Sequence, residues 1–559
     1  MSGFEATGEP GENELLFLSL GGAGEIGMNL NLYGHAGAWL MVDLGITFGD
    51  DETPGIDVIM PDPTFIEERA DTLAGLVLTH AHEDHIGAVP YLWSRLRCPL
   101  YATPFTASIL RRKLAEAGLK DQAPITEIPL SGRFDVGPFD IELITLTHSI
   151  PEPNACVIRT GAGTVMHTGD WKLDPDPQVG PSTDEAALIR AGEEGILAMV
   201  CDSTNVLVQG TSGSEGDVRE TLTEMMGRFG NRIVVGCFAS NVARVESIAH
   251  AAAANDRSVG LVGRSLWRFY EAAQENGYLT DIPRFLSAKE AAMLPRDKVA
   301  LICTGSQGEP RAALTRIARD DHQDVKLDPG DAVIFSSRVI PGNEKSIGRL
   351  QNRLTGLGVE LLTTHDNKHI HVSGHPARDE LAQMYQWVRP QIAVPVHGEI
   401  RHMQAHAQLA RDCQVPEAHL APNGTVLRLA PGPAEIVDEV FSGRLALDGS
   451  RLISMGSGAL RERRKMLQSG AAVVTVVVDE TGELQADPQI STQGVFDLEA
   501  DHEIADSLID TAADAVEDLP RKSRLKDDHV HEAVRLAVRR RLRALCGKRP
   551  AVEVHLVRL

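Results

Sequence analysis

Three histidines and two acidic residues lie within six consecutive positions, His80 to His85, directly after an apolar segment. The segment LAGLVLT at 73–79 is typical of a short buried strand, and IGAVPYLWSRL at 86–96 has helical spacing. Histidine and carboxylate side chains are natural ligands of Zn²⁺, Mn²⁺ and related ions. In open α/β folds, functional sites form where a buried strand ends. The stretch therefore predicts a metal site, the alternative being a solvated loop that is rich in histidine.

The spacing within this stretch indicates two adjacent ions. His80 and His82 lie two positions apart, as on one side of an extended chain, whereas Asp84 and His85 follow after the chain turns toward the helix. Three further predicted strands each end on one candidate ligand, namely His148, Asp170 and His397. Any of these alone is more often a structural residue than a ligand. Together they supply the missing partners, including a carboxylate able to bridge two ions.

Length and composition describe a globular protein of several domains. The 559 residues exceed the roughly 250–300 residues of a single core, and 43% are hydrophobic and 24% charged. The N-terminus lacks the basic and apolar regions of a signal peptide, and no apolar run approaches the ~20 residues that span a bilayer. We therefore expect a cytoplasmic protein. Seven cysteines without a CxxC pair predict reduced thiols and argue against a sulfur-ligated metal.

The formal net charge of −24 argues against nucleic-acid binding through overall charge, because phosphate binding relies on lysine and arginine. A binding site depends on local charge, however, and basic clusters occur at residues 461–465, 521–526 and 539–549. Each cluster is either a contact for an acidic partner or a solvated helix face, and the sequence leaves both interpretations open.

The pattern of apolar runs, turns and helical segments along the sequence predicts one domain interrupted by another. Residues 14–205 alternate short apolar runs with turns, whereas residues 213–340 show the helix-then-strand rhythm of a parallel sheet. The final block combines the strand candidates AAVVTVVVD and AVEVHLVRL with a helix at 527–547. The predicted organisation is a first domain formed by 1–212 and 374–442, an inserted domain at 213–373, a linker at 443–459, and a small α/β domain at 460–559.

GGAGEIG at residues 21–27 contains the G-x-G-x-x-G pattern of dinucleotide-binding folds, with Asp43 near the position of the acid that binds ribose. That fold requires a helix next. The following residues, MNLNLYGHAGAWLMVD, instead alternate around the turn GHAG, as in a hairpin. The pattern therefore favours a tight glycine turn between strands over an NAD site.

Several motifs together resemble a known enzyme family. HAHEDHIG matches the HxHxDH motif of the metallo-β-lactamase superfamily, and the later strand-end His, Asp and His follow that superfamily's order. The narrower motifs CDSTN, FASNVARV, TGSQGEP, HVSGHPARDE and PVHGE are similar to those of the ribonuclease J family, a bacterial member of the β-CASP branch. The resemblance implies an αββα metallo-β-lactamase sandwich interrupted by a β-CASP parallel-sheet domain, with a small C-terminal α/β domain.

The resemblance also implies a role for each motif residue. One metal ion is assigned His80, His82 and His148, the other Asp84, His85 and His397, with Asp170 bridging them. Substrate contacts are implied at Ser240, Asn241, His371, Ser373, Gly374 and His375. Two positions depart from the family pattern. Ala243 stands where the family usually has histidine, so any contact made there is lost or replaced, and Ala81 replaces a common glycine with another small residue.

Phosphodiester hydrolysis is the chemistry that these parts predict, with Asp84, His371 and His375 as catalytic residues. Two divalent ions about 3.5–4 Å apart polarise a phosphoryl oxygen and ready a shared water for attack on phosphorus. His375, whose charge switches near pH 7, would donate a proton to the departing ribose 3′-oxygen. His371 would orient His375 or bind phosphate. Alternatively, HVSGH is only a phosphate-binding turn that uses Ser373 and the Gly374 backbone N–H.

The function implied by the resemblance is metal-dependent cleavage of RNA, both from the 5′ end and internally, in RNA maturation and decay. The expected cofactors are two divalent ions, with zinc first and manganese or magnesium as alternatives. The expected partners are single-stranded RNA with a 5′-monophosphate, further copies of the chain in a homodimer or homotetramer, and other RNA-decay proteins. The C-terminal block either dimerises, with AAVVTVVVD as its central strand, or packs only on its own chain.

Three rival functions are weighed against this one. A hydrolase of small thioesters or lactams shares HxHxDH but does not need the inserted domain or HVSGH. A β-CASP enzyme that acts on DNA is closer, because the phosphates of RNA and DNA look alike. A metal-free scaffold in an RNA-decay assembly is disfavoured by the intact set of seven ligands.

Overall fold

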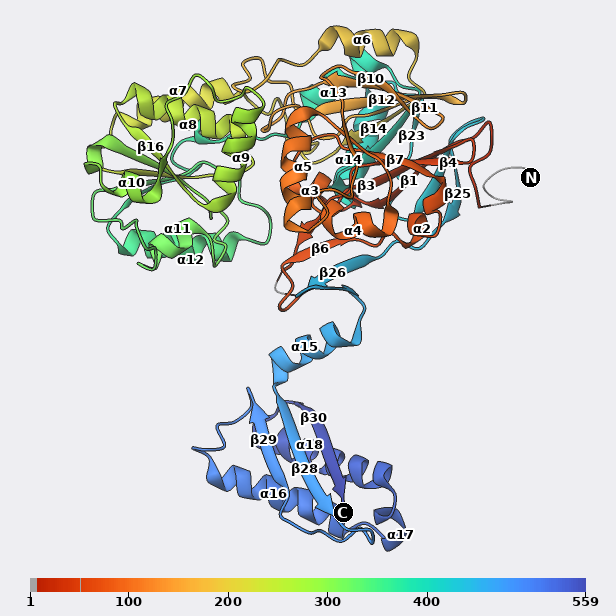
Figure 1. Ribbon diagram of the computed structural model, residues 1–559, viewed down its shortest axis with the longest axis vertical. Helices are drawn as coiled ribbons and strands as arrows, with labels where there is room; N and C mark the ends of the chain where they lie inside the picture. The colour runs from red at the N-terminus through yellow and green to blue at the C-terminus, as the bar shows by residue number, and fades with distance from the viewer. Residues whose placement is uncertain (1–7, 51) are drawn as a thin grey trace. The chain divides into compact units, whose positions relative to one another are not determined.

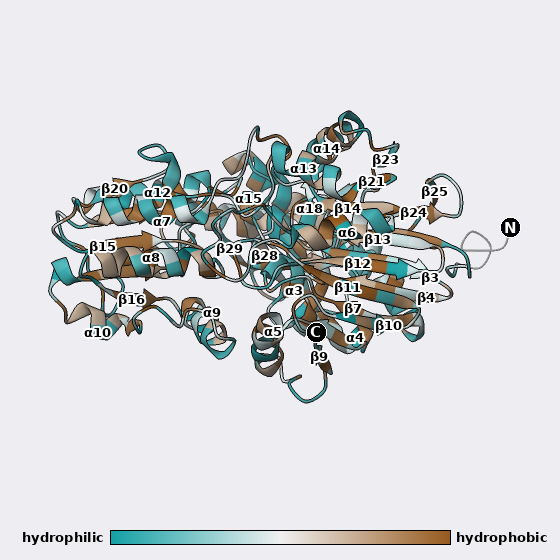
Figure 2. Ribbon diagram, turned by 90° about the horizontal axis from the view of Figure 1, so that it is seen from above, coloured by the Kyte–Doolittle hydropathy of each residue, from teal (hydrophilic) through white to brown (hydrophobic). Residues whose placement is uncertain are grey.

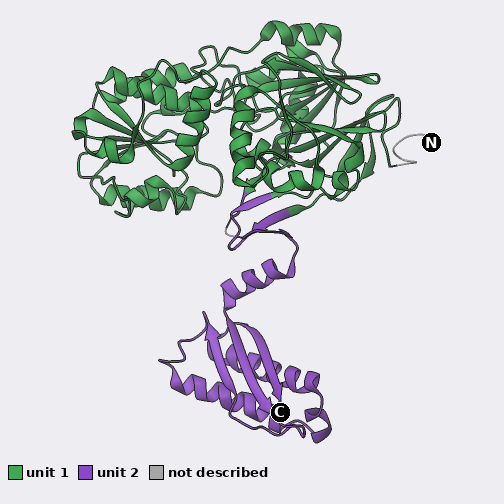
Figure 3. Ribbon diagram, viewed as in Figure 1, with its two compact units in different colours: residues 1–47, 60–444 green, residues 48–59, 445–559 purple. Residues whose placement is uncertain are grey.

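The structure is a computed structural model that describes residues 8–50 and 52–559. It divides into two compact units, one formed by residues 1–47 and 60–444 and the other by residues 48–59 and 445–559 (Figure 3). Among the described residues, every helix is too short or too polar to cross a membrane.

The first sheet of the larger unit is formed by residues near both ends of that unit. Its inner strands β1, β3 and β4 are antiparallel neighbours, and β7, β8 and β9 continue the sheet in parallel to β4. The glycine turn at 21–27 therefore connects strands, and the predicted hairpin around GHAG is confirmed. The strands in spatial order are β25 (Glu435–Glu439), β24 (Thr425–Ala430), β1 (Leu15–Gly21), β3 (Leu30–His35), β4 (Ala38–Val42), β7 (Leu73–Val77), β8 (Leu100–Ala102) and β9 (Ile125–Glu127).

The second sheet contains the strands that end near the predicted site. Strands β10 to β13 are antiparallel, whereas β13, β14, β21 and β23 run parallel, so that β13, β14 and β21 end at one edge. Strand β21 lies beside β14 although almost two hundred residues separate them, which encloses the inserted domain. The order is β10 (Arg133–Val136), β11 (Phe139–Thr145), β12 (Asn154–Thr160), β13 (Gly163–His167), β14 (Ala198–Asp202), β21 (Ile392–Val396) and β23 (Glu417–Ala418).

The two sheets pack face to face with helices outside them. Between the sheets, Phe17 and Leu40 belong to the same buried cluster as Ile158 and Val200. On the far side of the first sheet, Trp39 contacts Phe65 of α2 (Thr64–Glu67), with ring centroids 5.4 Å apart. The far side of the second sheet packs against α6 (Glu185–Glu194), α13 (Arg378–Val388) and α14 (Ile400–Asp412). In Figure 2 the strands are mainly hydrophobic, as expected for sheets buried on both faces.

The inserted segment forms a third sheet in which every pairing is parallel, as the helix-then-strand rhythm predicts. Its helices lie on both faces of the sheet (Figure 1). The strand order is β17 (Leu286–Ser287), β16 (Ser258–Val262), β18 (Val299–Cys303), β15 (Ile233–Gly236), β19 (Ala332–Phe335) and β20 (Glu360–Leu362). The helices are α7 (Glu215–Met226), α8 (Val242–Ala254), α9 (Arg264–Glu275), α10 (Ala288–Ala292), α11 (Ala313–Ala318) and α12 (Glu344–Gly356).

The smaller unit contains a three-stranded sheet, in which β28 (Ala471–Val478) is the central strand, as predicted. It pairs with β29 (Gln489–Gln493) and β30 (Ala551–Arg558). Alternate residues of β28 are buried, because only one face of the sheet packs on α16 (His502–Glu517) and α18 (Asp527–Cys546). The helix α18 is confirmed, whereas α16 was not predicted.

Residues 443–459, which were expected to be a linker, contain regular structure. Strands β26 (Arg444–Asp448) and β27 (Arg451–Ser454) pair as an antiparallel hairpin, and α15 (Gly458–Ser469) begins at Gly458. The two-residue turn Gly449–Ser450 between alternating apolar residues is a hairpin signal. The serine and glycine content of the segment concealed that signal, so the hairpin was not predicted.

Candidate metal centre

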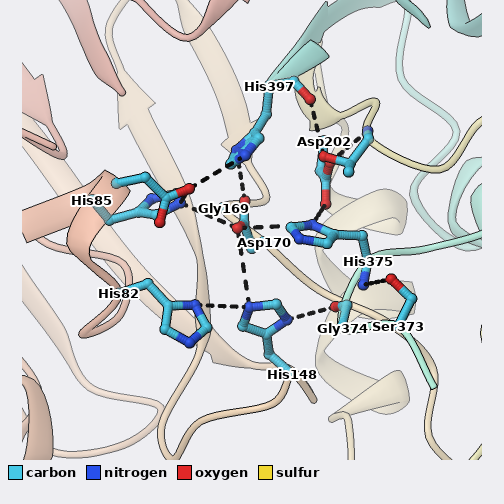
Figure 4. Close-up of polar contacts among 12 residues, drawn as sticks. His82, His85, His148, Gly169, Asp170, Asp202, Ser373, Gly374, His375 and His397 are labelled. Atoms are coloured by element: carbon cyan, nitrogen blue, oxygen red, sulfur yellow. Dashed lines mark hydrogen bonds and ion pairs between the residues drawn. The ribbon is translucent and has the colours of Figure 1, made fainter. Parts of the chain in front are cut away.

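The predicted metal ligands all lie on the segments that follow strands, within a few residues of the strand ends or on the short helix after β7. His80 and His82 follow β7, and the short helix α3 (Glu83–Ile86) carries Asp84 and His85. His148 follows β11, Asp170 follows β13 and His397 follows β21. Because these strands belong to two sheets that face each other, their ends meet at one edge of the sandwich, and the side chains converge there (Figure 4).

The seven side chains form two groups that share Asp170. One group is His80, His82, His148 and Asp170, and the other is Asp84, His85, His397 and Asp170; within each, the potential ligand atoms lie within 4.8 Å of one another. Asp170 Oδ2 lies 3.2 Å from His85 Nε2 and 3.9 Å from His80 Nε2, one nitrogen from each group. The structure therefore brings together all seven predicted ligands, in the two sets that the resemblance implies.

The potential ligand atoms of the centre are of the kinds that bind divalent metal ions. One of its buried atoms, His397 Nε2, has no hydrogen-bond partner among the described residues, which is costly unless another group satisfies it. Burial, helped by neighbouring imidazoles, holds the pKa of His80 and of His82 well below the usual range, so both are neutral and able to ligate. Burial opposes ionisation of Asp170, but His397 and His85 hold its pKa well below the usual range. Imidazole and carboxylate in this ratio suit Zn²⁺ or Mn²⁺.

Asp43 orients one of these imidazoles. It is fully buried directly after β4, and its Oδ2 accepts a hydrogen bond from His85 Nδ1 at 2.7 Å. Thr79 donates to the same carboxylate from its backbone N–H and its hydroxyl, both at 2.8 Å. His85 Nε2 is thereby left free to face Asp170, an arrangement that is common behind metal-bound histidines. The sequence drew attention to Asp43 only as a candidate ribose contact, although its position at a strand end was the useful signal.

The loop 371–375 reaches the metal centre through Gly374. His148 Nδ1 donates to the carbonyl oxygen of Gly374 at 2.5 Å, which directs His148 Nε2 toward Asp170. A Cβ atom at position 374 would lie 2.6 Å from His148 Cε1, so this close approach requires glycine. Gly374 was predicted to contact substrate through its N–H. The structure adds a role for its carbonyl, which positions a ligand.

His375, the predicted proton donor, lies beside the metal centre. Its Nδ1 is 2.8 Å from Asp202 Oδ2 and 3.8 Å from Asp170 Oδ2. Burial opposes the charged form of His375, but Asp202 and Asp170 raise its pKa above the usual value. Asp202 ends β14 and is fully buried. Asp202 was not predicted as a site residue. The available signal was that the motif CDSTN follows a predicted strand, as the motifs with the predicted ligands do.

His371 pairs with a buried arginine. Arg244 Nη1 donates to His371 Nδ1 at 3.2 Å, and no described residue hydrogen-bonds to His371 Nε2. Arg244 is itself held by Glu215, at 3.0 and 2.8 Å, and donates to the Ser336 carbonyl at 2.8 Å. No hydrogen bond joins His371 to His375 among the described residues, so the expectation that His371 orients His375 gains no support, and phosphate binding remains a prediction.

The other predicted substrate residues have structural partners. Asn241 Oδ1 caps α8 by accepting from the Arg244 N–H at 2.8 Å, and Ser240 precedes it, half-buried. Ser373 Oγ accepts from Asn205 Nδ2 at 2.7 Å. Ala243 N–H donates to the carbonyl of Ser149, the residue after His148, so the position that lacks the family histidine does lie near the centre. Contact of these residues with substrate remains a prediction.

Four family models match the chain. Their descriptions are a β-lactamase superfamily domain over residues 53–189, the β-CASP domain of ribonuclease J over 230–354, a Zn-dependent metallo-hydrolase RNA specificity domain over 365–416, and the ribonuclease J C-terminal domain over 458–559. Together with the sheets described above, these matches confirm the predicted fold class.

Curated relatives match over most of the chain. Ribonuclease J of Sinorhizobium meliloti is 46% identical over 98% of this chain and 98% of its own length. The ribonucleases J of Mycolicibacterium smegmatis and Thermus thermophilus are 42% and 36% identical, over 82% and 84% of this chain and 82% and 83% of their own. A crystal structure of a protein of unknown function from Enterococcus faecalis V583 shares the fold, with a TM-score of 0.52 at 16% identity, over 74% of this chain and all of that one. This chain belongs to the ribonuclease J family.

Proposed function

We propose that this protein is a metal-dependent ribonuclease that hydrolyses RNA phosphodiesters from the 5′ end and internally, in RNA maturation and decay. The observation that carries the proposal is the position of His375, which is paired with buried Asp202 and lies 3.8 Å from the carboxylate that joins the two ligand groups. This position supports His375 as the proton donor beside the proposed metal ions. The family relatives, which are named ribonuclease J, make RNA the substrate class.

Two divalent ions fit the centre, with zinc first and manganese or magnesium as alternatives. His80, His82 and His148 would hold one ion, Asp84, His85 and His397 the other, and Asp170 both. Bound there, the ions would supply Lewis-acid polarisation of a phosphoryl oxygen and an acidified water. Asp43 and the Gly374 carbonyl keep His85 and His148 in the tautomers that present Nε2 to the centre.

His375 is the proposed proton donor, and His371 is the proposed phosphate-binding residue. Asp202 occupies His375 Nδ1, so the proton available for the departing ribose 3′-oxygen is the one on Nε2. His371 Nδ1 accepts from Arg244, which leaves its Nε2–H as a donor, and the buried Nε2 has no described partner. Burial holds the pKa of His371 well below the usual range, so it binds as a neutral donor and suits a phosphate oxygen of the substrate.

The expected substrate is single-stranded RNA with a 5′-monophosphate, and contacts to the backbone predict weak sequence preference and strong salt dependence. A homodimer or homotetramer, and other RNA-decay proteins, complete the proposed partners.

The test compares one RNA sequence carrying a 5′-monophosphate, a 5′-triphosphate or a 5′-hydroxyl, together with the corresponding DNA. The metal-stripped protein is assayed after addition of Zn²⁺, Mn²⁺ or Mg²⁺, with Asp170→Asn as the inactive control. We expect release of mononucleotides from the monophosphate RNA and slower internal cleavage of the other RNAs. If the protein degraded DNA faster than RNA, DNA would be the substrate class. If it cleaved none of the substrates with any of the metal ions, the protein would be a scaffold and not an enzyme.

A further inference from the structure

A second cluster of metal-ligating side chains lies in the inserted domain. Glu246 and His250 are four residues apart on α8 and therefore share one face of that helix. Asp281 faces them from the loop between α9 and β17. His250 Nε2 lies 3.5 Å from Asp281 Oδ2 and 3.8 Å from Glu246 Oε1, and the three potential ligand atoms lie within 4.8 Å of one another. In the part of the chain that the structure describes, this is the only such group without Asp170.

Two of these side chains are largely shielded from solvent, because Glu246 is buried and His250 is half-buried. Glu246 is only 9% exposed, and its carboxylate accepts no hydrogen bond from any described residue. His250 Nε2 is likewise buried and without a hydrogen-bond partner in residues 8–50 and 52–559. Arg219, whose charge reaches both groups, donates to Gln178 at 2.9 Å and forms no ion pair with Glu246 among the described side chains. Unsatisfied buried polar atoms are rare in native proteins and call for an explanation.

A divalent cation satisfies all three groups at once. Ligand atoms at the usual zinc distances of about 2.0–2.2 Å from a four-coordinate ion are roughly 3.3–3.5 Å apart, close to the separations seen here. Burial, with Asp281 beside it, raises the pKa of Glu246 to about 7, although the charge of Arg219 acts in the opposite direction.

We propose that Glu246, His250 and Asp281 bind a structural divalent ion of the Zn²⁺ or Mn²⁺ class, with water completing its coordination. The ion would join α8 to the loop that follows α9. That loop also contacts the sandwich, because Tyr278 Oη donates to Glu152 Oε1 at 3.1 Å and Asn276 Nδ2 donates to Ser108 Oγ at 2.9 Å. The proposed ion thus holds in place the loop through which the inserted domain contacts the sandwich.

The test counts ions in the full-length protein and needs no RNA, so it is independent of the proposed function. The protein is stripped with chelator and dialysed against Zn²⁺ or Mn²⁺ alone, and bound metal per chain and the melting temperature are measured. The variants are His250→Ala and Asp281→Asn, with His365→Ala, an exposed histidine outside the cluster, as the matched control. We expect wild type and H365A to bind one ion more per chain than H250A and D281N, and to gain more in melting temperature when metal is added.

Loss of one ion, or at least tenfold weaker binding of one ion, in D281N supports the site. Equal counts and affinities in wild type, H250A and D281N would overturn it. Should H250A fail to fold, D281N decides alone, because the Asp281 side chain is 68% exposed and asparagine has nearly the same shape.

Discussion

Replacing Asp202 with asparagine tests whether the carboxylate behind His375 supports catalysis. Asp202 is fully buried, accepts from His375 Nδ1 at 2.8 Å through Oδ2 and from the Thr204 N–H at 2.8 Å through Oδ1. Asparagine keeps the shape and one acceptor oxygen but removes the charge that stabilises protonated His375. A hydrogen bond to a charged group contributes about 1.5–3 kcal/mol, which corresponds to a loss of roughly 10- to 150-fold in rate.

The assay is single-turnover cleavage of a 5′-monophosphate RNA at saturating enzyme, with RNA affinity and bound metal measured separately. We expect the loss in the cleavage step, with little change in RNA affinity or metal content. The matched control is Asp331→Asn, another fully buried carboxylate, which accepts from Arg232 N–H and pairs with Arg296 in the inserted domain. This control should lower the melting temperature but leave the rate per folded molecule unchanged.

The reasoning would be refuted if D202N cleaved at the wild-type rate. It would equally fail if the whole loss were accounted for by missing metal or by weaker RNA binding, because Asp202 would then act on the structure of the centre and not on the proton donor.

Three further predictions concern a buried ion pair, the reactivity of the thiols and the pH dependence of stability. Arg244→Met leaves buried Glu215 without its cation, so it should lower the free energy of unfolding by about 3–5 kcal/mol in urea titrations. The R244M/E215L double variant should recover part of this loss, and a change below about 1 kcal/mol in R244M would contradict the prediction. Only Cys413 and Cys546, which are half-buried, should react readily with a thiol reagent in the folded protein, because the other five thiols are buried; faster modification of more than two would be inconsistent with the structure. Burial lowers the pKa of His406 to about 4, so its contribution to stability is present above pH 6.5 and is lost as the pH falls toward 4. Between pH 7 and 4.5 the wild type should therefore lose about 2.5 kcal/mol more than His406→Gln, and equal losses in urea titrations would disprove the assignment.

The metal centre was predictable because its ligands obey a local rule. Each follows an apolar strand, and neighbouring strands that run in parallel deliver their ends to one edge of a sheet. His148, Asp170 and His397 needed no knowledge of their partners to be recognised as candidates, and the αββα arrangement followed from the resemblance of the surrounding motifs. The strand-rich pattern of residues 14–205 and the helix-then-strand pattern of residues 213–340 are likewise local. The sheets formed by these two regions confirm both patterns.

The groups that support the ligands were harder to foresee, because their partners are chosen by tertiary structure. Asp43 meets His85 across 42 residues, and Asp202 meets His375 across 173. Arg244 lies in a helix of mainly small and apolar residues, and nothing local shows that it binds His371. The hairpin at 444–454 was missed for a different reason, since a strong two-residue turn was outweighed by the polar composition around it.

The order of the ligands along the chain has a consequence for synthesis on the ribosome. His80 and its neighbours are made early, but β21 and His397 come only after the inserted domain, as does the Gly374 carbonyl that orients His148. At translation rates of about 5–20 residues per second, synthesis from Asp170 to His397 takes some 11–45 s, during which six of the seven predicted ligands have been made and His397 is still missing. The complete set of predicted ligands is therefore available only once nearly all of the larger unit has been made.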